Sequence, residues 1–218
     1  MTTQLETLSF EQLADHVTAW FKETLPRAEH RRLLPPTLQE LAKGRPVAME
    51  TLAERAGIPI EEAHSFLSKA GGEWDATETR LIGWGLTQNP TPHSFQVNGH
   101  DLFTWCAADS VFFPVVIGAH ARIVSPCAAT GELIHIDMTP TGVKWVEPPG
   151  AVVSIVTPSV DVSEVRAAVC KAQNFYRTAD AAASWREQHP DGLLLPVKDV
   201  FELYRRAVHS IWADQVPS

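Results

Sequence analysis

The sequence predicts an α+β fold in which a helical, winged-helix-like N-terminal module packs on a mixed β-sheet domain with flanking helices. Two observations lead to this prediction. Up to about residue 70, apolar residues recur at helical spacing and glycines end the segments. From about residue 98, short apolar segments typical of strands alternate with turns. We therefore expect a helical module with a hairpin over residues 1–97 and an α+β domain with all three cysteines over residues 98–218.

The N-terminal module is expected to begin with one or two helices over residues 1–30. Three short helices follow in the prediction, at about Thr37–Lys43, Met49–Ala56 and Ile60–Ala70. We expect Pro35-Pro36 to open the first of them, because proline is tolerated at the start of a helix and disrupts its interior. A glycine follows each of the three segments and is expected to end it.

Strands are expected from about residue 81 onward. Leu81–Leu86 and Ser94–Val97 are predicted to form a hairpin around the turn-forming sequence Asn89–Pro92, which gives the element order of a winged helix. The later strands are short and apolar, at Ala121–Val124, Leu133–Met138, Val143–Val146 and Val152–Thr157. Helices are expected at Trp105–Phe112, from about Ser163, around Ala179–His189, and at Val197–Trp212.

The charge balance disfavours two classes of partner. The formal net charge is -8 and no basic block is segregated along the chain, so phosphate backbones and anionic lipids should repel the protein. Its longest apolar runs fall far short of the ~20 residues that a membrane helix needs. The N-terminus does not resemble a signal peptide. We expect no nucleic-acid partner, no membrane partner and a cytoplasmic location.

The three cysteines, Cys106, Cys127 and Cys170, form no Cys-x-x-Cys pair and no disulfide framework. In a reducing compartment they are free thiols. Most free cysteines are small buried hydrophobic residues, and the alternative here is that they are ligands of a soft metal.

The segment around Cys106 favours the second interpretation. Thr104 is expected to cap a helix, which would place Cys106 in the first turn, where the helix dipole favours a thiolate. Asp109 lies three residues later, on the same helix face. A soft thiolate beside a proton-carrying carboxyl suits protonation of a metal–carbon bond. A second thiolate would weaken a mercury–carbon bond further, and either Cys127 or Cys170 must supply it.

At this point the chain resembles a known family, the organomercurial (alkylmercury) lyases, from about Leu33 onward. The order and spacing of several motifs together make the match specific. They are Leu41-Ala-Lys-Gly-Arg-Pro-Val47, Gly83-Trp-Gly-Leu-Thr87, Leu102-Phe-Thr-Trp-Cys-Ala-Ala-Asp109, Phe113-Pro-Val-Val-Ile-Gly118, Cys127-Ala-Ala-Thr-Gly131, Val146-Glu-Pro148, and Val165-Arg166 before Cys170.

The resemblance implies a role for each of these positions. Cys106 and Cys170 would be the catalytic thiolates that hold mercury, and Asp109 would carry the proton to the leaving carbon and contact the product Hg²⁺. Trp105 would flank the substrate pocket, and Cys127 would be structural. The implied reaction converts an organomercurial substrate, R–Hg⁺, and H⁺ into R–H and Hg²⁺.

The resemblance also implies what the reaction needs besides the protein. No cofactor is expected, small thiols should assist turnover, and mercuric reductase is the expected acceptor of Hg(II). The chain departs from some members in two places. Lys171 stands where they have a second cysteine. Val169 stands where they have an aromatic residue, and this smaller side chain is expected to widen the pocket.

Two alternatives remain open in the sequence. One is a mercury-binding winged-helix regulator, because the segment from Thr51 to Glu61, with Gly57 at the turn, has the composition of a helix-turn-helix. Glu61 and Glu62 would then face DNA, and the negative charge of DNA would repel these two carboxylates. The other is a non-catalytic carrier of soft metals, for which a proton donor such as Asp109 is unnecessary.

Overall fold

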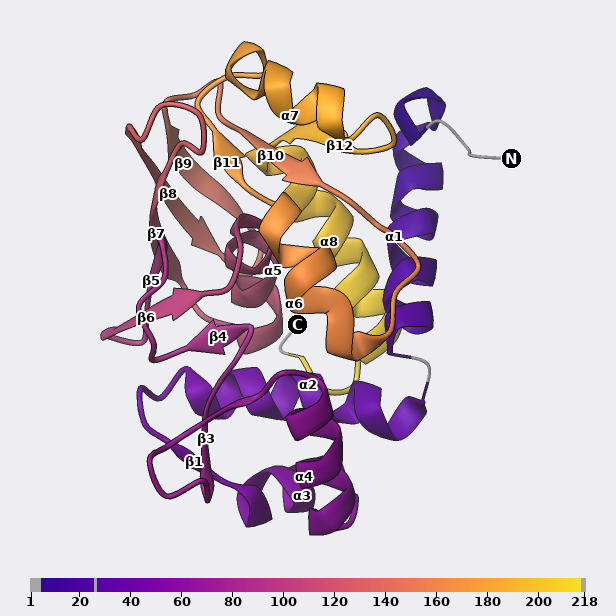
Figure 1. The fold of residues 1–218 in the computed structure, drawn as a ribbon, viewed down its shortest axis with the longest axis vertical. Helices are drawn as coiled ribbons and strands as arrows, with labels where there is room; N and C mark the ends of the chain where they lie inside the picture. Colours follow the sequence, from indigo (N-terminus) through magenta and orange to yellow (C-terminus); the bar gives the residue numbers. More distant parts are fainter. Residues whose placement is uncertain (1–4, 26, 217–218) are drawn as a thin grey trace.

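The computed structural model describes residues 5–25 and 27–216, and it confirms the α+β class (Figure 1). The larger sheet has nine strands, in the order β1-β3-β4-β6-β5-β7-β8-β9, with β2 beside β3. Their bounds are β1 Val47–Ala48, β2 Glu73–Trp74, β3 Arg80–Trp84, β4 Leu86–Thr87, β5 His93–Val97, β6 His100–Thr104, β7 Ala121–Pro126, β8 Leu133–Thr139 and β9 Gly142–Glu147. In the smaller sheet, β10 (Val152–Ile155) pairs with β11 (Phe175–Tyr176) and β12 (Leu193–Pro196).

The helices α5, α8 and α1 pack in layers on one face of the larger sheet (Figure 1). α5 is buried between the strands and α8, and α1 covers the outer side of α8. α2, α3 and α4 cluster at the end of the molecule where β1 to β3 lie. The bounds are α1 Phe10–Thr24, α2 Ala28–Leu41, α3 Met49–Ala56, α4 Ile60–Lys69, α5 Ala107–Ile117, α6 Val165–Ala168, α7 Ala183–Gln188 and α8 Val197–Trp212. The predicted bounds of α3 and α8 are confirmed. The parts of the predicted first helices on residues 1–4 and 26 lie outside the described residues.

Two prolines lie inside a helix that they were expected to open. α2 begins at Ala28 and continues through Pro35 and Pro36 to Leu41, so the predicted start near Thr37 is wrong. Proline removes the hydrogen bond to the carbonyl four residues earlier, which for Pro35 is that of Arg31. The indole N–H of Trp212, on α8, donates to this carbonyl at 2.7 Å. A tertiary contact thus replaces the missing helical hydrogen bond.

The strands near residue 81 pair differently from the prediction. β3 and β5 do not form a hairpin; β3 pairs with β4, and β5 pairs with β6 and β7. Gly85 reverses the chain between β3 and β4 with φ +74°, and a Cβ there would lie 2.6 Å from the Phe113 ring. The true hairpin turn is Asn98-Gly99, whose φ values of 53° and 79° are those of a type I′ turn.

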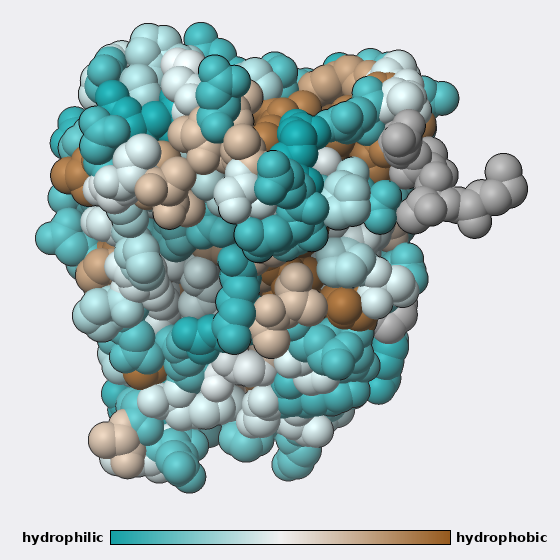
Figure 2. Space-filling view, turned by 45° about the horizontal axis from the view of Figure 1, so that its top comes forward, coloured by the Kyte–Doolittle hydropathy of each residue, from teal (hydrophilic) through white to brown (hydrophobic). Residues whose placement is uncertain are grey.

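The boundary expected between residues 97 and 98 falls in this hairpin turn, and the sheet continues across it through the β5–β6 pairing. The division into two modules, and the likeness of the first to a winged helix, stay predictions. The surface in Figure 2 is mostly hydrophilic, with apolar side chains in small patches. Among the described residues, no helix combines the length and the apolar character that crossing a bilayer requires.

A buried histidine should make the fold sensitive to acid. His93 is 7% exposed, its Nδ1 lies 2.8 Å from the Ser125 hydroxyl, and burial lowers its pKa to about 4. Between pH 6.5 and 4 the histidine is protonated in the unfolded chain but not in the native protein. The free energy of unfolding therefore falls as the pH drops from 6.5 towards 4. We expect the free energy of unfolding of His93→Asn, measured by urea titration, to depend less steeply on pH over this interval than that of the wild type. An unchanged slope would contradict the assignment.

Candidate active site

The N-terminus of α5 presents two of the predicted residues. Every residue of this helix is buried except Asp109, which faces a pocket. The sequence predicted Thr104 as the cap of this helix, and this is wrong because the cap is Cys106. The backbone N–H of Asp109 donates to Cys106 Sγ at 3.5 Å. Thr104 instead hydrogen-bonds the Cys106 carbonyl and the Ser110 hydroxyl, at 3.1 and 2.6 Å. The Thr104 hydroxyl thus binds the first turn of α5 without using the Cys106 thiol, which faces the pocket.

Cys170 arrives from a separate part of the chain. It begins a single 3-10 turn, Cys170–Ala172, that follows α6. The carbonyl that ends this turn, on Ala172, accepts from the Ser154 hydroxyl and the Trp185 indole, both at 2.8 Å. β10 and α7 therefore hold the turn from two sides, and the sulfur of Cys170 is left pointing toward α5.

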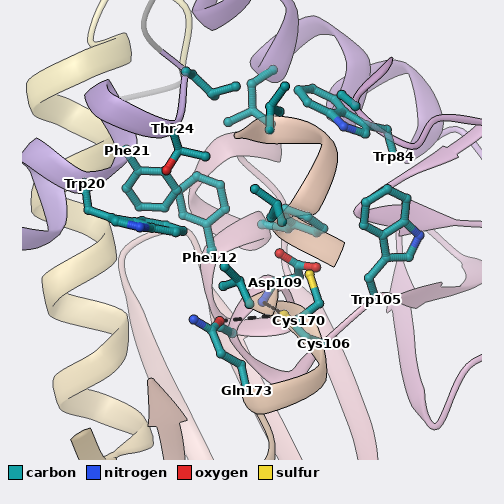
Figure 3. Close-up of a pocket in the computed structure, with 18 of the residues that line it drawn as sticks. Trp20, Phe21, Thr24, Trp84, Trp105, Cys106, Asp109, Phe112, Cys170 and Gln173 are labelled. Carbon is teal, nitrogen blue, oxygen red and sulfur yellow. Dashed lines mark hydrogen bonds between the residues drawn. The ribbon is translucent and has the colours of Figure 1, made fainter. Parts of the chain in front are cut away.

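The structure brings Cys106, Asp109 and Cys170 together (Figure 3). One ligand atom of each, the two sulfurs and a carboxylate oxygen, lies within 4.8 Å of the others. Two thiols and one carboxylate form a donor set that favours a soft, thiophilic metal. The sequence left Cys127 and Cys170 as rival second thiols, and Cys170 is the one that lies beside Cys106.

Burial changes the protonation of Cys106 in the direction opposite to the one expected from its helix. Removal from water, the Cys170 thiol and the Asp109 carboxylate raise the pKa of Cys106 well above its usual value, while the backbone N–H of Asp109 lowers it. Desolvation outweighs the helix dipole here because the side chain is 1% exposed. The resting residue is a thiol and carries a proton that a reaction can use.

The pKa of Asp109 is raised into the range that suits uptake and release of a proton. Burial raises its pKa to about 7, although its contacts with Cys106 act in the opposite sense. Its Oδ2 is buried and has no hydrogen-bond partner. A buried oxygen without a partner costs less free energy when the carboxyl is protonated than when it is charged. The group therefore exchanges a proton readily near neutral pH.

The pocket above these three groups is small and apolar. Its volume is about 110 Å³. An apolar cavity of roughly 150 Å³ accepts a benzene ring, so this one has the size for a small organic group. The aromatic part of the lining comes from four separate regions of the fold: Trp20 and Phe21 on α1, Trp84 on β3, Trp105, Phe112 and Phe113 at α5, and Tyr204 on α8.

Comparison with known proteins agrees with this geometry. The family model described as alkylmercury lyase, MerB, matches residues 86–209. An alkylmercury lyase of Streptomyces lividans is 39% identical over 95% of this chain and 96% of its own length. Another, of Bacillus cereus, is 44% identical over 79% of each chain. The chain belongs to the alkylmercury lyase family.

A solved structure shares the fold of this family member. The crystal structure of the mercury-bound form of MerB2 covers 89% of this chain and 98% of its own, with a TM-score of 0.71 and 20% sequence identity. At this level of identity the likeness concerns the backbone alone. The match extends beyond residues 86–209 and therefore includes elements of the N-terminal part.

Trp105 of this family member is held at the pocket by a charged pair. The Glu73 carboxylate accepts from its indole N–H at 3.1 Å and from Arg166 at 2.6 Å. The Arg166 guanidinium lies over the Trp105 ring, 4.4 Å from its centroid. Trp105 thus lines the pocket, and the chain segment before Cys170 is tied to it; a role of Trp105 in substrate binding stays a prediction.

Several pocket residues escaped the sequence reasoning. Trp20 and Phe21 lie on α1, within residues 1–30, for which the sequence predicted only one or two helices. Tyr204 lies on the apolar side of α8 and Gln173 follows the Cys170 turn, and neither carried a local signal. Only packing brings these side chains to the pocket.

Cys127 is separate from this cluster. It lies 1% exposed in the turn before Gly131. Burial alone would raise its pKa, but hydrogen bonds from the Thr130 hydroxyl and from the backbone N–H groups of Arg177, Ala129 and Thr130 lower it overall. The structural role implied for Cys127 stays a prediction.

We expect Cys127→Ser to reduce the free energy of unfolding by about 1 kcal/mol, because the serine oxygen can accept the same hydrogen bonds but packs less well. Hydrocarbon release from an arylmercury compound should be unchanged. Urea denaturation and a turnover assay on the same preparation measure both effects. A loss of turnover without a loss of stability would place Cys127 in the reaction.

Proposed function

We propose that the protein breaks the carbon–mercury bond of alkyl- and arylmercury compounds by protonation, and releases a hydrocarbon and Hg(II). The observation that carries this proposal is the convergence of two thiols and a carboxyl of raised pKa at the base of an apolar pocket. Membership of the alkylmercury lyase family supports it.

The proposed chemistry balances with the groups present. Two thiols and R–Hg–X give R–H, HX and Hg(II) bound by two thiolates. One thiol proton leaves with X when the first sulfur binds mercury. The second protonates the carbon, as the electron pair of the Hg–C bond moves to that carbon and the second sulfur binds the metal. We assign the two thiols to Cys106 and Cys170, because their sulfurs lie in one cluster.

Asp109 is the proposed proton carrier between sulfur and carbon. It is next to Cys106, whose raised pKa keeps the thiol proton in place until mercury binds. Mercury lowers the affinity of sulfur for its proton, because metal ligands must be deprotonated. The proton then passes to Asp109, whose pKa of about 7 suits both uptake and release near neutral pH. Its oxygen can also contact the Hg(II) that remains.

The apolar pocket is the proposed site for the organic group, and Trp105 is one of its walls. Burying carbon there is favourable by the hydrophobic effect, and excluding water protects the developing carbanion from competing donors. The two alternative functions gain no support from this site. A carrier or a regulator needs thiols but not an apolar pocket with a proton donor at its base.

Release of Hg(II) completes the proposal. We propose that small thiols remove the product by exchange and that mercuric reductase is the protein that accepts it, with no organic cofactor taking part. Thiol exchange is the reasonable route because Hg(II) binds thiolates so tightly that it would otherwise remain on the enzyme. We also propose that the reaction takes place in the cytoplasm, without nucleic-acid or membrane partners; the three cysteines are free, as a reducing compartment requires.

The direct test is benzene release from a phenylmercury salt in the presence of excess small thiol. We expect many equivalents of benzene per protein molecule, measured by gas chromatography. A protein that binds mercury tightly but releases no benzene would be a carrier, and the proposal would be wrong. Protein denatured by heat before the assay provides the blank for hydrolysis by the thiol itself.

A further inference from the structure

One buried side chain contacts Cys106 and has no assigned part in the reaction. Gln173 is 3% exposed and lies three residues after Cys170. Its backbone and side chain both reach the N-terminus of α5; the dashed line in Figure 3 marks the side-chain contact with Cys106. A fully buried amide needs partners for both its oxygen and its nitrogen.

The orientation of the Gln173 amide is determined by its surroundings. Its Nε2 donates to the Val156 carbonyl at 3.0 Å. A carbonyl can only accept, so the nitrogen must point there and the oxygen must point the other way. Gln173 Oε1 then lies 3.8 Å from Cys106 Sγ and accepts from its S–H. Gln173 is thus an acceptor for the Cys106 thiol, in addition to the contacts of that thiol with Cys170 and Asp109.

The backbone of the same residue joins the two cysteine segments. The N–H of Ala107, the first residue of α5, donates to the Gln173 carbonyl at 3.2 Å. The N–H of Gln173 donates to the Cys170 carbonyl at 3.2 Å. One residue therefore connects the turn of Cys170 to the helix of Cys106, and its side chain contacts the Cys106 thiol.

We propose that Gln173 is a positioning residue: by accepting the S–H of Cys106, it selects the rotamer in which the sulfur faces Cys170 and Asp109. Mercury binds two ligands in a line, so a sulfur that turns away loses the geometry for attack. The proposal deepens the lyase function above and rests on it. Gln173 lines the pocket but is not one of the three groups that would hold mercury.

The first experiment compares Gln173→Leu with the wild type. The S–H stretching band of Cys106 is isolated in the infrared as the difference from a Cys106→Ser spectrum. We expect the band to move to higher wavenumber in Gln173→Leu, because the S–H loses its acceptor. Benzene release should fall about tenfold or more, as is usual when a partner that orients a metal ligand is removed. A merely structural residue would not move this band.

A matched control is Gln39→Leu. The Gln39 amide also donates to backbone carbonyls, those of Val116 and Gln215, both at 3.1 Å, but it does not line the pocket. This change should lower stability while leaving both the band and turnover unchanged. If Gln173→Leu leaves the band in place and turnover within about twofold of the wild type, the positioning role is overturned.

A second variant keeps the test valid if Gln173→Leu does not fold. In Gln173→Glu, the protonated acid can still donate to the Val156 carbonyl and accept from the thiol, whereas the ionised form cannot donate. We expect the wild-type band position at low pH and a shift as the new acid ionises. A band that stays constant while the acid titrates would overturn the pairing. A wild-type protein without lyase activity would refute the lyase function alone, because the infrared band requires no substrate.

Discussion

Replacing Cys170 by serine should abolish turnover while leaving the fold intact. Serine is close to cysteine in size, but its hydroxyl is a hard ligand with little affinity for mercury. Cys106 alone would still capture R–Hg⁺, and the carbon–mercury bond would remain because no second sulfur replaces the carbon. We expect benzene release from a phenylmercury salt to fall by more than about 10³-fold, as when a residue that acts as part of a catalytic unit is lost.

The same preparation allows the two steps to be separated. Mass spectrometry of the native Cys170→Ser protein should show one phenylmercury group retained, where the wild type retains only mercury. Cys106→Ser should be equally inactive. Cys127→Ser is the matched control, because it makes the same exchange at a buried cysteine outside the cluster. Turnover by Cys170→Ser at a rate near that of the wild type would refute the two-thiolate mechanism.

Asp109→Asn should separate activity from stability, with opposite signs. Asparagine cannot carry the proton, so we expect benzene release to fall by about 10²- to 10⁴-fold, the usual contribution of a positioned acid or base. Hg(II) should still bind, because both thiols remain. Rapid-quench measurement of a single turnover, with mercury binding followed by ultraviolet absorption, distinguishes the two effects. An unchanged rate would remove Asp109 from the proton path.

The stability of the same variant depends on pH in a calculable direction. The Asp109 carboxyl has a pKa near 3.8 when unfolded and about 7 in the native protein. Between these values the native state holds a proton that the unfolded state has lost, so the wild type loses stability as the pH rises through this interval. Asp109→Asn lacks this loss. It should be more stable than the wild type at pH 8, by about 1–3 kcal/mol, and the difference should shrink towards pH 4.

A matched control for this effect is Asp137→Asn on β8. The contacts of Asp137 with His120 and Arg122 lower the pKa of its carboxyl despite the opposing effect of burial. A carboxyl with a lowered pKa stabilises the native state at neutral pH, so this variant should be less stable at pH 8 and fully active. If Asp109→Asn were also destabilised at pH 8, the native pKa of Asp109 would not be raised.

The sequence alone determined the features that depend on neighbours along the chain. Apolar spacing and terminating glycines predicted α3, and helical periodicity predicted α8, with the bounds that the structure has. The spacing of three residues between Cys106 and Asp109 placed a thiol and a carboxyl on one helix turn. Motif order identified the family. The helices and the Cys106–Asp109 spacing rest on interactions within a few residues, which a sequence displays directly.

The tertiary structure decided everything that depends on which distant groups meet. Pro35 remains helical because Trp212 supplies the lost hydrogen bond, and the expected β3–β5 hairpin gives way to the type I′ turn at Asn98-Gly99. Cys170, rather than Cys127, reaches Cys106 because a turn held by two other elements carries it there. Desolvation by the surrounding core, which no local pattern encodes, reversed the protonation expected for Cys106. The residues that we propose to react are thus visible in the sequence, whereas their pairing and their protonation are set by packing.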